Sequence, residues 1–230
     1  MEKLLYSIIK KNTMFSDKKL DYLEKTVLSL VKDQVVGDIA ECGVWMGGAV
    51  ALIAKVLLDN NDTKFLRLFD SFNDPHECKP VDGSYLIDQL GGKQRATGKL
   101  VPIEGYYNKV TKGIGPGNPK KVFNLLAKTI GYPEDKIKIY KGWVQTTLPQ
   151  YSKRIEKISM LILDCDLYEP QRLCLEYLYD KVVPNGIVIV DDYYSLEGCS
   201  KAVDEFRSKL GINEEIKRVS NTSCIFWVKK

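Results

Sequence analysis

Acidic side chains end two apolar stretches in the C-terminal half of the chain. Residues 159–166 read S-M-L-I-L-D-C-D, and residues 186–192 read G-I-V-I-V-D-D. Runs that are apolar on both faces are typical of strands in a parallel sheet covered by helices. Because ligands of open α/β sheets bind beyond the carboxyl ends of the strands, we expect chemistry at the acids that end these runs. These acids are Asp164, Asp166, Asp191 and Asp192.

Carboxylates gathered at neighbouring strand ends repel one another strongly in a partly desolvated cleft. A divalent cation is the simplest means of offsetting that repulsion, and a set of oxygen ligands suits Mg²⁺ or Ca²⁺. The alternative interpretation is that each pair of acids only caps the helix that follows it. Both pairs acting as caps is the less economical explanation, so the sequence predicts a metal site.

A strand–turn–helix pattern lies earlier in the chain, where residues 37–48 read G-D-I-A-E-C-G-V-W-M-G-G. This unit is where Rossmann-like folds bind a nucleotide. Glu41, which precedes Gly43, would repel a phosphate but attract a cation. S-adenosylmethionine carries an ammonium and a sulfonium, so Glu41 and Gly43 fit that ligand better than a dinucleotide. A plain glycine turn without a ligand is the alternative.

Two further strand ends complete the predicted cofactor site. The second strand ends in F-D-S-F, which contains Asp70 and Ser71. An acid in this place commonly holds a ribose diol, and the alternative for Asp70 is a turn-forming role. Gly142 and Trp143 follow the third strand, at a turn that borders the adenine in such folds. For Trp143 the alternative is a place in the hydrophobic core.

Strand and helix patterns alternate along the chain, which predicts an α/β Rossmann-like fold. We expect a mostly parallel sheet with helices on both faces, preceded by an N-terminal helical segment over 1–36. The main domain spans 37–230 and ends in an antiparallel hairpin. Helices are expected over 2–11, from Ser16 to about Val31, and over 119–130, 170–181 and 199–209; strands are expected over 37–44, 64–72, 136–140, 159–166 and 186–192, with the hairpin in 216–229.

The pattern breaks between residues 73 and 119, a stretch longer than loops usually run without a function. It contains D-P-H-E, L-G-G-K and G-I-G-P-G-N-P. We interpret it as a lid-like insertion with a short helix near 84–90, and glycine-rich flanks would let it open and close. A disordered surface loop is the alternative. The only histidine, His76, lies here and is better explained as incidental than as catalytic.

Composition describes an ordinary globular protein of 230 residues, with 44% hydrophobic and 28% charged side chains. The net charge of +4 is compatible with an acidic substrate but too small to indicate nucleic acid. Six cysteines without C-x-x-C spacing indicate a reducing compartment. Because we find neither a signal peptide pattern nor a membrane-length apolar run, we expect a cytoplasmic protein. Its first helix packs either on the body or on a second copy in a homo-oligomer.

Six motifs follow one another in an order that resembles the macrocin O-methyltransferase family. They are G-D-I-A-E-C-G-V-W-M-G-G, F-D-S-F, K-G-W-V-Q-T-T-L-P, L-D-C-D-L-Y-E, V-D-D-Y-Y and G-C-S-K-A-V-D-E-F. The resemblance runs from about residue 37 to the C-terminus and is weakest in the insertion. It implies a metal-dependent enzyme that uses S-adenosylmethionine to methylate sugar hydroxyls on glycosylated natural products.

The resemblance also implies roles for the acids at the strand ends. Asp164, Asp191 and Asp192 would hold Mg²⁺, and Asp166 would act as the base. If the chain stays extended from Leu163 to Asp166, the side chains of Asp164 and Asp166 point to the same side of the sheet. One acid can then hold the cation while the other removes a proton from the acceptor. The alternative is that Asp166 is itself a metal ligand.

Two departures from the family pattern stand out, and neither removes a proposed ligand. Met46 stands where arginine is common, and Cys165 stands where glycine is common. The stretch 73–119 does not closely match the members that modify macrolides, so the resemblance leaves the acceptor open.

Three other functions compete with methyl transfer. A glycosyltransferase of the D-x-D type would hold a nucleotide sugar through a metal at Asp164 and Asp166, but it has no use for Asp191 and Asp192 or for the Glu41 turn. A metal-dependent hydrolase could use all four carboxylates and would not bind S-adenosylmethionine. A binding module that has lost its catalytic site would bind no cofactor.

Overall fold

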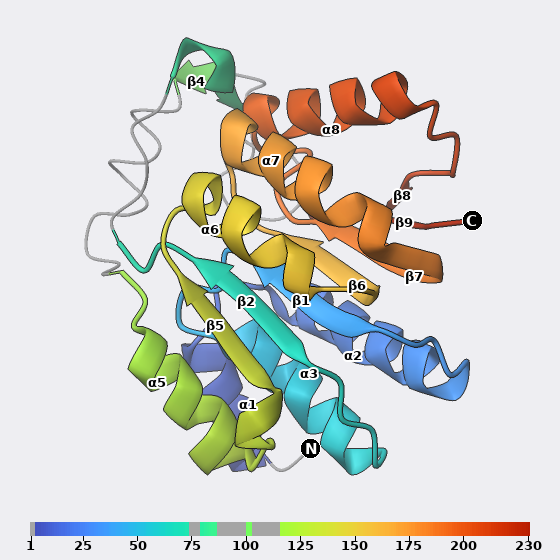
Figure 1. Cartoon of the computed structure of the whole chain (residues 1–230). Helices are drawn as coiled ribbons and strands as arrows, with labels where there is room; N and C mark the ends of the chain where they lie inside the picture. Colours follow the sequence, from blue (N-terminus) through green and yellow to red (C-terminus); the bar gives the residue numbers. More distant parts are fainter. Residues whose placement is uncertain (1–2, 74–78, 87–99, 103–115) are drawn as a thin grey trace.

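The computed structural model describes residues 3–73, 79–86, 100–102 and 116–230. Within this part of the chain a sheet of seven strands has the order β5-β2-β1-β6-β7-β9-β8 (Figure 1). The first five strands in that order run parallel, and β9 pairs antiparallel with both β7 and β8. The strands are β1 (Asp38–Cys42), β2 (Leu66–Asp70), β5 (Ile137–Lys141), β6 (Ile158–Leu163), β7 (Val182–Val190), β8 (Lys217–Arg218) and β9 (Ile225–Val228).

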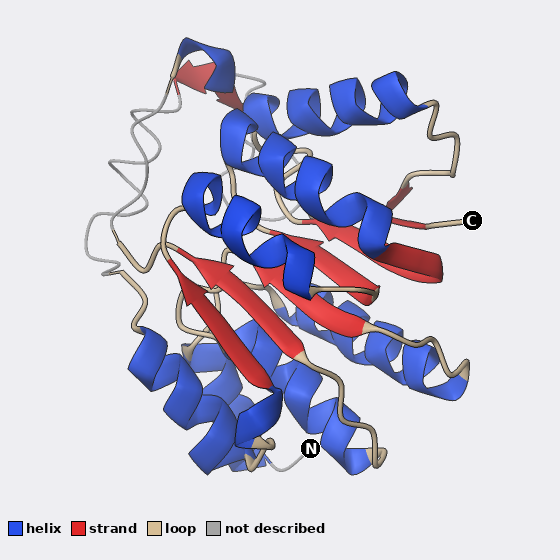
Figure 2. Cartoon of the chain, viewed as in Figure 1, coloured by secondary structure: helices blue, strands red, loops and turns tan. Residues whose placement is uncertain are grey.

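Helices cover both faces of this sheet (Figure 2). One face carries α1 (Lys3–Lys11), α2 (Asp17–Lys32), α3 (Gly48–Asp59) and α5 (Pro119–Asn124), which continues as a π-helical stretch over Leu125–Ile130. The other face carries α6 (Val144–Tyr151), α7 (Tyr168–Leu178) and α8 (Glu197–Leu210). This arrangement confirms the predicted α/β class, the parallel sheet and the C-terminal hairpin.

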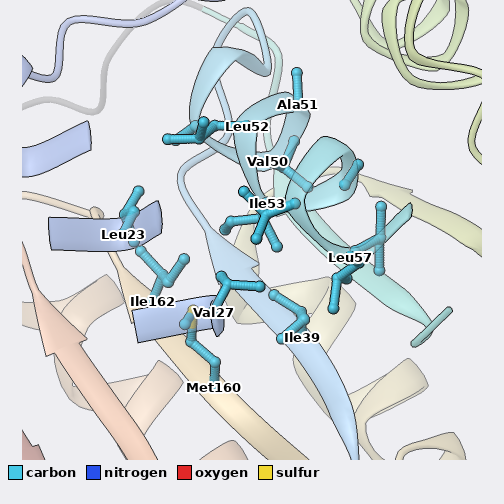
Figure 3. Close-up of a cluster of buried hydrophobic side chains, with 14 of the residues drawn as sticks. Leu23, Val27, Ile39, Val50, Ala51, Leu52, Ile53, Leu57, Met160 and Ile162 are labelled. Carbon is cyan, nitrogen blue, oxygen red and sulfur yellow. The ribbon is translucent and has the colours of Figure 1, made fainter. Parts of the chain in front are cut away.

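Two hydrophobic clusters fill the layers above and below the sheet, because successive residues of each strand point to opposite faces. In β6, Met160 and Ile162 face α2 and α3, whereas Leu161 and Leu163 face α6 and α7. Figure 3 shows Leu23 and Val27 of α2 lying over Ile39, Met160 and Ile162. Burial on both faces explains why these strands read as continuous apolar runs.

The N-terminal helices share this core. Ser16 caps α2, and its hydroxyl accepts a hydrogen bond from the Lys19 backbone N–H. Ile9 of α1 is fully buried, and the backbone N–H of Gly48 donates to the Asn12 carbonyl at 2.8 Å. A Cβ at Gly48 would lie 2.5 Å from the Ile9 carbonyl oxygen, so a glycine is required where α1 crosses the start of α3.

The structure corrects one expectation in the insertion. Ser84–Leu86 form strand β3, which pairs antiparallel with β4 (Leu100–Pro102), and not the start of a helix. The error arose because a strand this short is defined by a partner that is distant in sequence, which a local pattern does not reveal. Most of the predicted lid, together with His76, lies outside the described residues.

Helix α6 was not anticipated from the sequence. It follows Trp143 directly and contains Pro149 in its interior, and a proline argues against a helix when only the sequence is read. Its Val144, Thr147 and Leu148 are buried against the sheet, so packing outweighs the local penalty. Among the described residues, no helix combines the length and the hydropathy that crossing a membrane requires.

Candidate active site

The predicted site residues lie in or just after β1, β2, β5, β6 and β7. These five strands run parallel, so their carboxyl ends share one edge of the sheet (Figure 1). Backbone hydrogen bonds carry the ladder one residue beyond these strands. The N–H of Asp164 donates to the Cys42 carbonyl at 2.8 Å, and the N–H of Asp191 donates to the Leu163 carbonyl at 3.0 Å. The backbones of the two acidic motifs are therefore held firmly by the sheet itself.

Three carboxylates converge at this edge. Asp164, Asp166 and Asp192 each offer one oxygen, and these oxygens all lie within 4.8 Å of one another. All three residues are half-buried. The arrangement does not come from an extended chain as expected, because β6 ends at Leu163 and Asp166 has a left-handed φ of 60°. Aspartate tolerates this conformation better than most residues, and here the turn brings its carboxylate back beside Asp164.

Asp191 has a different main partner from its neighbour Asp192. Its Oδ1 lies 2.5 Å from the Nζ of Lys19, and the two side chains are only 8% and 13% exposed. Lys19 comes from the first turn of α2, in the N-terminal segment. Asp192 instead accepts a hydrogen bond from the Ser223 hydroxyl at 3.4 Å. Asp191 is thus paired with a lysine and also lies within hydrogen-bond reach of the Asp164 side chain, whereas Asp192 belongs to the cluster of three carboxylates.

Burial and mutual repulsion disfavour the ionised forms of these acids and raise their pKa values. Burial, and then repulsion by Asp192, raises the pKa of Asp191 to about 6. Burial and the charge of Asp166 raise the pKa of Asp192 to about 7, and the pKa of Asp164 lies well above its usual range for similar reasons. Burial alone would lower the pKa of Lys19, but the charges of these acids outweigh it and raise that pKa. The oxygen donors and excess negative charge fit a hard divalent cation.

Asp70 organises the turn after β1. Its Oδ2 accepts hydrogen bonds from the backbone N–H groups of Val44 and Trp45 at 2.6 and 2.7 Å, and its Oδ1 accepts from the N–H of Phe72 at 2.6 Å. Ser71 accepts a weaker bond from the N–H of Asn73 at 3.2 Å. The carboxylate therefore performs the turn-forming role that was the alternative to ribose binding, and it does so across two loops.

Glu41 lies in β1 beneath this turn and is 2% exposed. Burial, and then the charge of Asp70, raises the pKa of the Glu41 carboxyl well above its usual range. Within the described residues its Oε2 is buried and has no hydrogen-bond partner. A buried carboxyl oxygen without a partner is costly, and a cationic ligand group is the kind of partner that removes the cost.

Gly43 joins the turn to the acid cluster. Its φ is 89°, and a Cβ at this position would lie 1.9 Å from the carbonyl oxygen of Asp164. Only glycine lets the end of β6 pass so close to the turn. The turn that contains Gly43 is therefore packed directly against the backbone of Asp164, which belongs to the acid cluster.

The turn after β5 borders the same region. The N–H of Gly142 donates to the Asp70 carbonyl at 2.9 Å, and Gly142 has a φ of 139°. The carbonyl of Trp143 accepts bonds from the N–H groups of Thr146 and Thr147 and begins α6. Trp143 is half-buried and not part of the fully buried core. Its contact with adenine, like the other site roles, stays a prediction.

Sequence reasoning missed Lys19, because α2 was interpreted as packing alone. A signal was present: Lys19 stands in helical register with Leu23, Thr26 and Leu30, all of which are buried. A lysine on the apolar face of a helix is unusual unless an acid receives it. What the sequence could not reveal is which acid that would be.

The sequence profile of the family described as Macrocin-O-methyltransferase (TylF) matches residues 9–104 and 120–229. A tetracenomycin 4'-O-methyltransferase of Streptomyces olivaceus, which acts on a dimethoxyrhamnosyl derivative, is 31% identical over 94% of this chain and 75% of its own. Mycinamicin III 3''-O-methyltransferase of Micromonospora griseorubida is 27% identical over 94% of this chain and 78% of its own.

A solved structure agrees with these relatives. The O-methyltransferase NovP superposes with a TM-score of 0.74 at 27% identity, covering 95% of this chain and 82% of its own. The fold described above is therefore that of an O-methyltransferase.

The raised pKa values predict how stability depends on pH when no divalent cation is present. In the folded protein Asp191 and Asp192 hold protons up to about pH 6 and 7, whereas their ordinary pKa is 3.8. The folded state therefore binds more protons, and the associated stability is lost as pH rises through 6 to 7. In chelator, the urea midpoint should be higher at pH 5.5 than at pH 8.

Asp192→Asn is the matched control, because it removes one titrating group without changing the shape of the side chain. The decline of the urea midpoint between pH 5.5 and 8 should be smaller in this variant than in the wild type. An equal decline in both proteins would show that the acid cluster does not carry the effect.

Proposed function

Because the chain belongs to the macrocin O-methyltransferase family and is a methyltransferase, we propose that it transfers a methyl group from S-adenosylmethionine to a hydroxyl of a sugar or glycoside. The observation that carries this proposal is the joining of two features at one sheet edge: a buried Glu41, whose Oε2 has no hydrogen-bond partner among the described residues, and a cluster of carboxylates. The names of the relatives, which include a rhamnosyl tetracenomycin and mycinamicin III, support a glycosidic acceptor. The glycosyltransferase and hydrolase alternatives have no such support.

S-adenosylmethionine is proposed to lie over the turn after β1. Glu41 offers its carboxylate to a cationic group of the cofactor, and Gly43 leaves room beside it. Asp70 holds the backbone of the turn through Val44 and Trp45, and its remaining lone pairs are available to a ribose. Ser71, Gly142 and Trp143 complete the proposed binding residues on the neighbouring loops.

A hard divalent cation, proposed to be Mg²⁺, would be held by the acids at the ends of β6 and β7. The resemblance assigns Asp164, Asp191 and Asp192 to it, whereas the geometry converges on Asp164, Asp166 and Asp192. A cation in this place would act as a Lewis acid on the acceptor hydroxyl and orient it. Asp164 and Asp192 belong to both sets and are therefore the core of the proposed site.

Asp166 is proposed to be the general base. A sugar hydroxyl keeps its proton at neutral pH, so its oxygen needs a nearby group that takes the proton as it attacks the methyl carbon. The left-handed turn at Asp166 places its carboxylate at the cluster but beyond the end of β6. The site must also align sulfur, methyl carbon and oxygen, and the rigid backbone of the sheet edge supplies that alignment.

Methyl transfer from labelled S-adenosylmethionine to a panel of deoxysugar glycosides and nucleotide sugars tests the proposed function. We expect labelled product with at least one sugar acceptor, complete loss of activity in EDTA, and recovery when Mg²⁺ is added in excess. Full activity in chelator would refute the metal dependence. Methylation of catechols but of no sugar would refute the acceptor class.

Glu41→Gln tests the cofactor site. The change removes the charge that attracts the cofactor, so affinity for S-adenosylmethionine measured by calorimetry should fall by about 1.5–3 kcal/mol, the scale of charge-assisted hydrogen bonds. Stability of the free protein should not fall, because Oε2 of this buried carboxyl has no hydrogen-bond partner among the described residues. Glu156→Gln, an exposed acid near the opposite end of β6, should leave affinity unchanged. Unchanged affinity in Glu41→Gln would remove Glu41 from the cofactor site.

Asp166→Asn separates the base from a metal ligand. The amide keeps the shape of the carboxylate but cannot take a proton, so turnover should fall by about 10²–10⁴-fold, the scale of general-base catalysis. Affinity for Mg²⁺ and S-adenosylmethionine should stay within a few fold of the wild type. If instead Mg²⁺ affinity falls and excess metal restores turnover, Asp166 is a ligand and another group is the base.

A further inference from the structure

We propose that Lys19 is a positioning residue of the active site, a fixed counter-charge that holds Asp191 and weakens the binding of a divalent cation to the neighbouring acids. This inference rests on the proposed cation site. It assigns a function in that site to the N-terminal segment, which the sequence indicated only as packing.

The position of Lys19 is determined by its own helix. The hydroxyl of Ser16 accepts the hydrogen bond of the Lys19 backbone N–H, and the Lys19 Nζ lies 5.3 Å from the centre of the Phe15 ring. Leu20 and Leu23, on the same part of α2, are each 1% exposed and pack into the core. The ammonium therefore approaches the sheet edge from a fixed backbone, and its side chain is only 13% exposed.

The partner of Lys19 is equally fixed. The backbone N–H of Asp191 is bonded to the Leu163 carbonyl at the end of the sheet ladder, and its carboxylate is 8% exposed. The 2.5 Å contact between Nζ and Oδ1 thus joins two side chains that have little freedom to separate. Breaking a buried pair of this kind leaves an uncompensated charge.

The charge of Lys19 also reaches beyond Asp191. It acts on Asp164 and Asp192 as well, and it favours the ionised form of each. When all four carboxylates are ionised, they and one ammonium at this edge sum to −3, and a divalent cation reduces the sum to −1. Without Lys19 the same acids would present −4, and they would attract a cation more strongly.

Lys19 could act as a counter-charge or only as a tether for the acids. These two roles predict opposite changes in cation affinity when Lys19 is replaced. If Lys19 only held the acids in place, its removal would loosen the site and weaken cation binding. If it is a counter-charge, its removal strengthens cation binding although it destabilises the fold. The sign of the change in affinity therefore distinguishes the two roles.

The experiment measures Mn²⁺ and Mg²⁺ affinity of the full chain by calorimetry in wild type, Lys19→Met and Lys19→Arg. We expect Lys19→Met to bind Mn²⁺ on the order of tenfold more tightly, as expected for the loss of a nearby charge, and Lys19→Arg to stay within about threefold of the wild type because it keeps the charge. Lys18→Met is the matched control, since Lys18 is an exposed neighbour on the same turn, and its affinity should not change.

Unchanged or weaker Mn²⁺ binding by folded Lys19→Met would overturn the counter-charge role. Absence of binding by the wild type and by every variant would instead show that the proposed cation site is wrong. If Lys19→Met does not fold, the ammonium signal of Lys19 in the wild type can be followed by ¹⁵N NMR and assigned with Lys19→Arg. Saturating Mg²⁺ should shift that signal and leave the Lys18 signal in place; no shift would refute the inference.

Discussion

The concentration of negative charge at one end of the sheet is the constraint on which the rest of this site depends. Parallel strands bring Asp164, Asp166, Asp191 and Asp192 to a common edge, and burial there raises the pKa of three of them. Charges held this way need compensation from a bound cation, from a proton or from a basic side chain. The same requirement predicts that the charge balance at this edge depends on pH, on a bound divalent cation and on Lys19 of α2.

A second constraint is the tight packing of backbone against backbone. Asp70 holds the turn after β1 through Oδ2 and the loop after β2 through Oδ1, and Gly43 lets the Asp164 carbonyl pass within a distance that excludes any side chain. The turn that is proposed to hold the cofactor and the strand end that is proposed to hold the cation therefore share one rigid frame. In methyl transfer the donor and acceptor must be aligned, so a shared frame is an advantage for catalysis.

The N-terminal segment belongs to this frame. Gly48 admits α1 against α3, and Leu23 and Val27 of α2 fill the core over β1 and β6. Lys19 then extends from the same helix to Asp191. Neighbouring turns of α2 thus supply both core packing and the ammonium that pairs with Asp191. We expect substitutions in these turns to affect both the stability of the fold and cation binding.

The sequence by itself determined the fold class and predicted the place of the site. Continuous apolar runs that stop at acids imply buried parallel strands, and the carboxyl ends of such strands share an edge. This reasoning predicted that Asp164 and Asp192 lie together, as the structure shows, whereas their role in a cation site stays a prediction. It could not determine the left-handed turn at Asp166, the strand at Ser84–Leu86 or the partner of Lys19. The strand and the lysine partner depend on contacts between segments distant in the chain, and only tertiary structure decides which distant residues meet.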